Sequence, residues 1–516
     1  MGNHPVTAKK SGENRGSLHD NLIAENFKLG DKYSTDQDLG AGKATQIKRG
    51  QLKRFTKSTQ NTGVAIKLYD GTVQSGSNLK TEAMILSQCD HPNIVRLFEV
   101  TKVNGQMSLV LELCDGGCVL DRLPYKESQA SNIVRQICSA VSYLHSKNMM
   151  HRDIECSNIL YASKSEDSEV KLVDFGSACE LQVIPGHNGA FRFLKEKTGS
   201  LHVMAPEVIR GKYGPKADVW SLGCVAYALL NNGEHPIKGQ TKDELERKIL
   251  QGSVDYRGWE HSTSSKNFVQ ATCNVNAGVR LSAAAALIHP WLLSAQKTSK
   301  KTLPIELVTS FSLYRISPPL KRIALNALAR KTKSSRYRET FEFINKSHSG
   351  IISKEEFMEA FKNSGNSDEE LEELFDKVDI NDNGGITYTE FIAATLETEG
   401  ELEEAQLQEA FALISSNGRY ITKKDIEDIV KESLKSQNEL EVIKNKFEVQ
   451  MNRLSKNHKK EKIHYEDFAQ MFEHGFDAHR SMDAIIETSL NEEQLNRMKE
   501  DDKIKHLAAI REQSDS

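Results

Sequence analysis

Hydrophobic residues follow different periods in successive parts of the chain. Residues 1–30 are polar and aperiodic, which predicts a flexible N-terminal arm. Residues 33–117 contain short apolar runs such as GVAIKLY and MSLVLEL, which are typical of strands, and one helical stretch, NLKTEAMILSQC. Residues 118–292 show helical spacing instead, as in DVWSLGCVAYALL. This order predicts a sheet-rich lobe followed by a helix-rich lobe.

A helix–loop–helix pattern repeats over residues 336–475. The phenylalanines that close successive helical stretches are Phe341, Phe375, Phe411 and Phe447. Their spacing indicates four related repeats. The repeats follow a junction, residues 294–335, and precede a charged tail, residues 476–516.

The junction contains a candidate amphipathic helix, residues 318–331. Its apolar face consists of Leu320, Ile323, Ala324, Ala327 and Leu328, with lysine and arginine beside it. Basic amphipathic helices of this kind resemble calmodulin targets. The pattern is also consistent with an ordinary packing helix, and both interpretations stay open.

Composition narrows the class of protein. The 516 residues, 38% hydrophobic and 27% charged with a net charge of −4, suit a soluble protein of two or more domains and argue against a general nucleic-acid binder. No apolar run reaches the ~18 residues of a membrane helix.

The eight cysteines, from Cys89 to Cys273, form no CxxC pair, which predicts reduced thiols in a cytoplasmic protein. Gly2 is a weak lipidation signal because Val6 stands where myristoylation favours Ser or Thr, so membrane association is not expected.

A glycine-rich stretch in the sheet-rich region is a candidate nucleotide loop. Glycine lets the backbone of a hairpin approach phosphates closely. The pattern is G-x-G-x-x-T, with threonine where a third glycine is expected, so on its own it is equally typical of a turn. The expected ATP-binding residues here are Leu39, Gly40, Ala41, Gly42, Lys43, Ala44, Thr45, Gln46 and Ile47.

The motifs VAIK, HRD, DFG and APE follow in that order and make phosphoryl transfer the expected chemistry. Lys67 is placed to reach the nucleotide phosphates, and Glu82 to hold Lys67 by an ion pair. Asp153 would accept the proton of the acceptor hydroxyl, and Asn158 and Asp174 would bind Mg²⁺. The order and spacing of these residues predict a catalytic site for ATP and Mg²⁺.

Other positions fit the same fold. Asp218 is expected to hold the backbone of the catalytic loop, and Arg280 to pair with Glu207. The residues from Glu112 to Cys114 would form the hinge whose backbone binds the adenine base.

The stretch DINDNGGITYTE, residues 379–390, has the spacing of a calcium-binding EF-hand loop. Gly384 occupies the sharp turn at the sixth position of the loop. The expected Ca²⁺ ligands are Asp379, Asn381, Asn383, Gly385 and Glu390. Because only two of them are carboxylates, we expect affinity on the order of micromolar or weaker.

The other three loops, residues 345–356, 415–425 and 452–467, are poorer in acidic ligands, and the last is rich in lysine. A cation is repelled by lysine and held weakly by a loop with one carboxylate. These loops are expected to be structural EF-hands without metal.

The order of kinase motifs, basic junction and EF-hand repeats, residues 33–475, resembles the calcium-dependent protein kinase family of plants and protists. The resemblance implies an α+β chain with a two-lobed protein-kinase fold followed by an all-α, calmodulin-like EF-hand domain. It implies a Ser/Thr kinase that uses ATP, Mg²⁺ and Ca²⁺ and acts on protein substrates. An intramolecular contact between junction and EF-hand domain would relieve inhibition when calcium binds. Glu196 falls where relatives often carry an acid in place of an activation-loop phosphate.

The chain departs from the family at the catalytic loop. Glu155 stands where Ser/Thr kinases carry lysine, so we expect a slower kinase with Glu155 paired to Lys195 or Lys197. Cys118 and Ser157 stand where relatives carry acids that recruit substrate arginine, so a preference for basic substrates does not carry over. Two alternatives stay open, a pseudokinase that holds nucleotide and relays calcium to a partner, and a kinase that works without calcium.

Overall fold

The structure of the protein is a computed structural model of the whole chain. It describes residues 23–28, 33–41, 45–52, 63–69, 73–103, 106–184, 186, 190–294, 305–317, 319–330, 337–347, 349–362, 364, 366–380, 383–396, 404–415, 418–425 and 462–473. The chain forms two compact units, residues 1–297 and residues 298–516.

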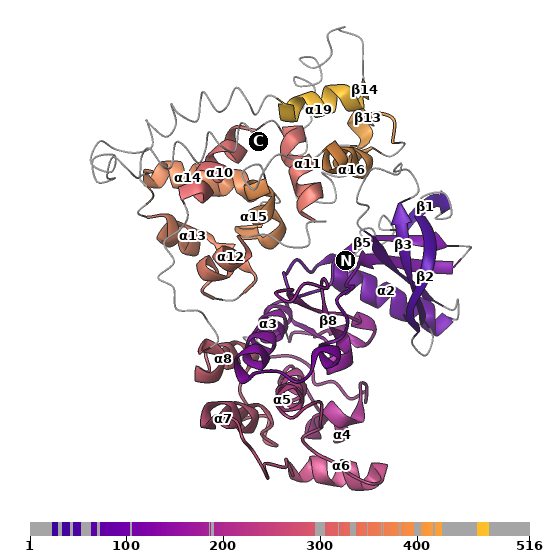
Figure 1. Cartoon of the computed structure of the whole chain (residues 1–516), viewed down its shortest axis with the longest axis vertical. Helices are drawn as coiled ribbons and strands as arrows, with labels where there is room; N and C mark the ends of the chain where they lie inside the picture. Colours follow the sequence, from indigo (N-terminus) through magenta and orange to yellow (C-terminus); the bar gives the residue numbers. More distant parts are fainter. Residues whose placement is uncertain are drawn as a thin grey trace, which may run out of the picture. The chain divides into compact units, whose positions relative to one another are not determined.

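The first unit begins with a six-stranded sheet in the order β1-β5-β6-β4-β3-β2. Strands β1, β2, β3 and β5 of this sheet are labelled in Figure 1. The strands are β1 (Ile23–Lys28), β2 (Tyr33–Ala41), β3 (Thr45–Leu52), β4 (Val64–Tyr69), β5 (Leu97–Val103) and β6 (Gln106–Glu112). Strand β1 is parallel to β5, and every other pair is antiparallel. Helix α2 (Val73–Ser87) packs against β4, β5 and β6.

Strand β1 corrects the prediction for the N-terminus. The prediction of a flexible arm over residues 1–30 is wrong for residues 23–28, which pair with β5. Without β1, β5 would be an edge strand with unpaired backbone N–H and C=O groups, which a further strand satisfies. Gly2 lies outside the described residues.

The rest of the first unit is mainly helical, as the hydrophobic spacing predicts. Its helices are α3 (Glu127–Ser146), α4 (Pro206–Ile209), α5 (Lys216–Leu230), α6 (Lys242–Gln251), α7 (Thr263–Thr272), α8 (Ala283–Leu287) and α9 (Pro290–Leu293). Every residue of α5 from Ala217 to Leu230 is buried, and α5 packs against α3 and α7. A helix that is apolar all round is typical of a domain centre. The fold is thus α+β, as predicted.

Two short antiparallel pairs hold the catalytic motifs together. Strands β8 (Ile159–Tyr161) and β9 (Val170–Leu172) form one pair, and β7 (Met149–Met150) and β10 (Cys179–Glu180) form the other. The HRD motif lies between β7 and β8, and the DFG motif lies between β9 and β10. The strands therefore bring two segments about twenty residues apart in sequence to the same place.

The described residues of the second unit form helices and two short strand pairs, and most of these helices are labelled in Figure 1. Its helices are α10 (Ile305–Ile316), α11 (Pro319–Ala329), α12 (Arg338–Ile344), α13 (Lys354–Phe361), α14 (Asp368–Val378), α15 (Tyr388–Thr395), α16 (Glu404–Ile414) and α19 (Tyr465–Glu473). Strand β11 (Ile351–Ser353) pairs with β12 (Gly385–Thr387), and β13 (Ile421–Thr422) pairs with β14 (Lys462–Ile463).

The junction helices belong to the core of the second unit. Helix α10 packs against α14 and α15, and α11 packs against α15 and α16. Leu320, Ala324 and Leu328 of α11 are buried as predicted, and the fully buried Leu325 extends their apolar face. The predicted contact between junction and EF-hand helices is therefore present, and α11 here is a core packing helix. Within the described residues, no helix has the length and apolar character needed to cross a membrane.

Candidate functional site

A buried lysine links three elements of the first unit. Lys67 on β4 places its Nζ atom 2.8 Å from a carboxylate oxygen of Glu82 on α2 and 2.8 Å from Asp174 Oδ1. Burial would lower the pKa of Lys67, but the charges of Glu82 and Asp174 outweigh it and raise that pKa. The lysine is therefore a fixed positive charge, and the Lys67–Glu82 ion pair expected from the motifs is present.

Tyr69 takes part in the same cluster and was not singled out from the sequence. Its hydroxyl donates to Glu82, and its side chain is buried. Residues two apart on a strand lie on the same face, so Tyr69 lies beside Lys67. A buried hydroxyl needs a hydrogen-bond partner. The sequence did offer a signal for this role, because a tyrosine follows the VAIK lysine by two residues.

Asp174 is held in a conformation that few residues adopt. Its φ angle is +59°, in the left-handed region, and its carboxylate accepts a hydrogen bond of 3.2 Å from the N–H of Gly176. Phe175 is fully buried, with its ring edge-on to His151 at 4.7 Å. Burial would raise the pKa of Asp174, but Lys67 and the Gly176 N–H lower it. Asp174 therefore stays ionised, as a metal ligand must.

Asp153 and Asn158 occupy the catalytic loop. The Asn158 side-chain amide donates to the Asp153 carbonyl at 2.9 Å and to its carboxylate at 3.3 Å, and Ser200 N–H donates to Asp153 Oδ1 at 3.1 Å. Burial and the charge of Glu155 raise the pKa of Asp153. A raised pKa makes this carboxylate a better proton acceptor. The contact from Ser200 was not predicted, because only the fold brings the two segments together.

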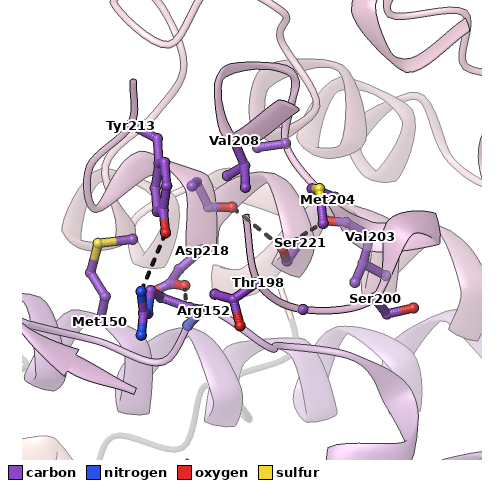
Figure 2. A pocket seen from close by; sticks show the side chains of 13 residues that line it. Met150, Arg152, Thr198, Ser200, Val203, Met204, Val208, Tyr213, Asp218 and Ser221 are labelled. Carbon is purple, nitrogen blue, oxygen red and sulfur yellow. Dashed lines mark hydrogen bonds between the residues drawn. The ribbon is translucent and has the colours of Figure 1, made fainter. Parts of the chain in front are cut away.

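Asp218 on α5 fixes the backbone of the catalytic loop. The carboxylate is buried and accepts hydrogen bonds from the N–H groups of His151 at 3.1 Å and Arg152 at 2.9 Å. Figure 2 shows Asp218 and Arg152 lining a small pocket between the catalytic loop and the segment that carries Thr198 and Ser200. The loop is thus anchored to the central helix, as expected for Asp218.

Arg152 connects the catalytic loop to the segment that follows DFG. Its guanidinium donates to the Ser177 carbonyl at 2.5 Å and lies 3.3 Å from the Glu196 carboxylate. The Tyr213 hydroxyl lies 3.4 Å from the same guanidinium (Figure 2). Glu196 therefore supplies the negative charge at the position where an acid was expected to stand in for a phosphate.

The Arg280–Glu207 pair is bidentate, with distances of 2.5 and 2.9 Å. The Arg280 side chain is fully buried, so the pair is a geometric constraint more than a source of stability.

The expected nucleotide residues lie on two strands and a hinge. On the β2–β3 hairpin, Gly40 pairs with Ile47, Ala41 pairs with Gln46, and Leu39 is exposed. Thr45 begins β3, whereas Gly42, Lys43 and Ala44 lie outside the described residues. Among the described residues other than its two chain neighbours, no heavy atom lies within 4 Å of the position that a Cβ would take at Gly40, which leaves space beside the hairpin there.

The hinge residues follow β6. Glu112 is buried, and its carboxylate forms an ion pair of 3.0 Å with Lys171. This carboxylate is therefore already engaged and does not serve nucleotide binding. Burial would raise the pKa of Glu112, but Lys171 and Arg96 lower it. Only the backbone of Glu112 is left to contact a base, as expected, and Cys114 is partly exposed beside it.

Glu155 has a different partner from the one expected. The Ser157 hydroxyl donates to the Glu155 carboxylate at 2.6 Å. Within the described residues, neither Lys195 nor Lys197 forms an ion pair with it, so the hypothesis of such a pair is wrong. A hydroxyl two residues away reaches the carboxylate without the ordering of a long lysine side chain.

The loop 379–390 has the geometry of a cation site. The Asp379 carboxylate accepts N–H bonds from Asn383 at 3.1 Å and Gly384 at 2.9 Å, and Glu390 accepts from the Thr387 N–H and hydroxyl at 2.9 and 2.8 Å. Gly384 has φ +84°, which favours glycine. Asn381 lies outside the described residues.

Calcium fits this loop. Asp379 and Glu390 are only 7% and 4% exposed, and buried carboxylates are costly unless a positive charge compensates them. No three His, Cys, Asp or Glu side chains in the described parts of the chain cluster as metal ligands. Calcium in this loop would be held by two carboxylates together with amide and carbonyl oxygens.

Loop 345–356 is closed by its own side chains. The hydroxyls of Ser347 and Ser349 donate to the Asn345 side chain at 3.1 and 3.4 Å, and Glu356 accepts from the Ser347 N–H at 2.7 Å. These groups occupy the positions where other EF-hands hold metal.

The third and fourth loops are described only in part. In loop 415–425 the Asp425 carboxylate accepts from the Thr422 N–H and hydroxyl at 2.7 Å each. Residues 452–461 of the fourth loop lie outside the described residues.

Comparisons with known proteins agree with both units. Residues 33–292 match the family model for the protein kinase domain, and residues 334–396 match the model for the EF-hand domain pair. Calcium-dependent protein kinase 5 of Plasmodium berghei (strain Anka) is 32% identical over 79% of this chain and 73% of its own length. Calcium-dependent protein kinase 33 of Arabidopsis thaliana is 31% identical over 69% of each chain. The chain belongs to the calcium-dependent protein kinase family, in which a Ser/Thr kinase domain is fused to EF-hands.

Proposed function

We propose that Lys67, Glu82, Asp153, Asn158 and Asp174 transfer the γ-phosphate of ATP to serine or threonine hydroxyls of protein substrates. Lys67 binds the nucleotide phosphates while Glu82 fixes its position. Asp153 orients the acceptor hydroxyl and accepts its proton. The contact of Lys67 with both Glu82 and Asp174 is the observation that carries this proposal, because it unites three motifs in one cluster.

Magnesium fits the oxygen atoms beside this cluster. Asp174 offers an ionised carboxylate, and the Asn158 amide nitrogen donates to Asp153, which leaves its oxygen available as a ligand. Mg²⁺ prefers such hard oxygen ligands and would offset the negative charge of the phosphates.

For nucleotide binding, we infer that the β2–β3 hairpin, Leu39 to Ile47, covers the phosphates. The backbone from Glu112 to Cys114 holds the base. The open space over Gly40 supports this assignment.

Calcium regulation is assigned to loop 379–390, with Asp379, Asn383, Gly385 and Glu390 among the ligands and Asn381 as a further one. The buried carboxylates support this assignment. The loop joins α14 to α15, and both of these helices pack against α10. A change in the loop therefore reaches the junction directly.

Phosphate transfer to a mixed protein substrate tests the proposal, with the wild type and Asp153→Asn compared in calcium and in EGTA. We expect calcium-dependent transfer by the wild type and a loss on the order of 100-fold or more in the variant. Asp167→Asn, at an exposed position between β8 and β9, is the matched control and should behave as wild type.

Absence of transfer by the wild type in both conditions would contradict the catalytic proposal. Equal transfer in calcium and EGTA would contradict the calcium switch alone.

A further inference from the structure

The segment from Leu194 to Ser200 borders the catalytic base. Its two ends are fixed, since Leu194 exchanges backbone hydrogen bonds with Tyr213 at 2.9 and 3.1 Å and Ser200 N–H donates to Asp153. Gly199 has φ +90°, and a Cβ there would lie 2.5 Å from the Arg152 carbonyl oxygen. The backbone therefore lies directly against the catalytic loop, beside the Asp153 carboxylate that we propose accepts the proton of the acceptor hydroxyl.

Two lysines of this segment are exposed. Glu196 between them bonds Arg152, whereas Lys195 and Lys197 are solvent-exposed. Across the described part of the chain, neither lysine ammonium has an ion pair or hydrogen bond. Their charges are therefore available to a bound molecule.

Further positive charge lies close to this segment. Arg192 is exposed, and the Lys212 ammonium lies 4.9 Å from the centre of the Phe193 ring, which is 53% exposed. This segment and the residues next to it thus carry four exposed cationic side chains, those of Arg192, Lys195, Lys197 and Lys212. Glu196, the carboxylate between the two lysines, is already paired with Arg152.

The positions that would attract a basic substrate are neutral. Ser157 donates its hydroxyl to Glu155, and the Cys118 thiol donates to the Cys156 carbonyl at 3.0 Å. Glu155 does carry a negative charge, but it lies beside Asp153 and raises the pKa of that base. Glu155 would repel an anionic substrate group, whereas Lys195 and Lys197 would attract one.

We propose that Lys195 and Lys197 select acceptor peptides with an anionic side chain, a carboxylate or a phosphate, within a few residues of the phosphorylated hydroxyl. This inference rests on the proposed kinase activity and names its substrate class. Lys212 and the exposed ring of Phe193 extend the same contact surface. Complementary charge of this kind gives specificity more than overall affinity.

A positional peptide library tests the inference with the full-length protein. Each position beside the acceptor serine carries glutamate, phosphoserine, alanine or lysine in turn, and kcat/KM is measured for each peptide. We expect glutamate or phosphoserine at one or more positions to exceed lysine by roughly tenfold. The glutamate and phosphoserine arms distinguish a carboxylate from a prior phosphate as the source of charge.

The double variant Lys195→Glu/Lys197→Glu should abolish or invert this preference. Lys164→Glu reverses the charge of an exposed lysine between β8 and β9 and is the matched control, which should keep the wild-type preference. Thermal unfolding checks that both variants fold. Preference for lysine-flanked peptides, or an unchanged preference in the double variant, would overturn the proposal.

Binding of fluorescent peptides with alanine at the acceptor position separates this inference from the catalytic proposal. Tighter binding of anionic peptides, lost in the double variant, supports the inference even if no peptide is phosphorylated. Equal binding of anionic and cationic peptides counts against the inference even if transfer occurs.

Discussion

At the scale of single residues, Glu155 is a departure next to the proposed catalytic base, Asp153. It puts a negative charge where Ser/Thr kinases carry a positive one, which would repel the transferred phosphate, and the hydrogen bond from Ser157 leaves that charge in place. Glu155→Lys removes this repulsion in the transition state, so we expect kcat to rise several-fold. Steady-state kinetics with saturating ATP and peptide measures the change. A fall in kcat would instead show that Glu155 has a role of its own.

Glu155 also affects how the rate of phosphate transfer depends on pH. Asp153 must be ionised to accept a proton, so activity falls as pH falls through its pKa. Burial and the charge of Glu155 raise that pKa. Glu155→Gln removes the second cause, lowers the pKa of Asp153, and should move the acidic limb of the kcat profile to lower pH. The exposed Glu166→Gln is the control, and an identical profile in both variants would contradict the coupling.

Tyr69 is a further residue whose role is testable. Tyr69→Phe removes the hydrogen bond to Glu82, so the Lys67–Glu82 pair loses part of its positioning. We expect kcat to fall roughly fivefold, equivalent to about 1 kcal/mol.

Tyr143→Phe on α3 is the matched control for Tyr69→Phe. The Tyr143 hydroxyl is also engaged, accepting from Asp90 N–H at 2.8 Å, but away from the lysine cluster. The control should lower the unfolding temperature without lowering kcat. Equal kcat in both variants would show that Tyr69 is only structural.

At the scale of elements, α11 is held by burial of its apolar face. Leu325 is fully buried in the core of the second unit. Leu325→Ala should destabilise that unit by about 2–5 kcal/mol, because a cavity remains where the side chain packed. Calorimetry should show a lower unfolding temperature for the second unit and an unchanged one for the first.

Leu229→Ala in α5 provides the reverse control, since Leu229 is buried in the first unit. It should lower the unfolding temperature of the first unit only. A shift of both transitions in either variant would mean that the two units unfold together.

The sequence predicts the features that follow from motif spacing, and it misses those that depend on which strands or side chains meet in the folded chain. Lys67, Asp153 and Asp174 were found from motifs because their local spacing follows from the chemistry they perform. Strand β1 was missed, since its polar sequence pairs only because β5 offers an open edge. The partner of Glu155 was also missed, because the choice between a nearby hydroxyl and a distant lysine is decided by side-chain geometry.

At the scale of the whole molecule, the calcium loop and the junction share one core. Loop 379–390 joins α14 to α15, and the Phe311 ring of α10 contacts Phe391 of α15 at 5.5 Å. The junction is therefore packed on the helices that calcium binding would move. Loop 345–356 pairs with the calcium loop through β11 and β12, and its own side chains close it. We therefore propose loop 379–390 as the calcium sensor within the first EF-hand pair.

Glu390→Gln tests that assignment, because it removes one of the two carboxylates expected to bind calcium in loop 379–390. We expect calcium-dependent activation to be lost, with activity in calcium falling to the level measured in EGTA. Glu356→Gln is the matched control, since Glu356 holds the same position in loop 345–356, where Asn345, Ser347 and Ser349 leave it as the single carboxylate ligand. It should keep the wild-type response. Full activation of Glu390→Gln, or loss of activation in Glu356→Gln alone, would move the sensor to another loop.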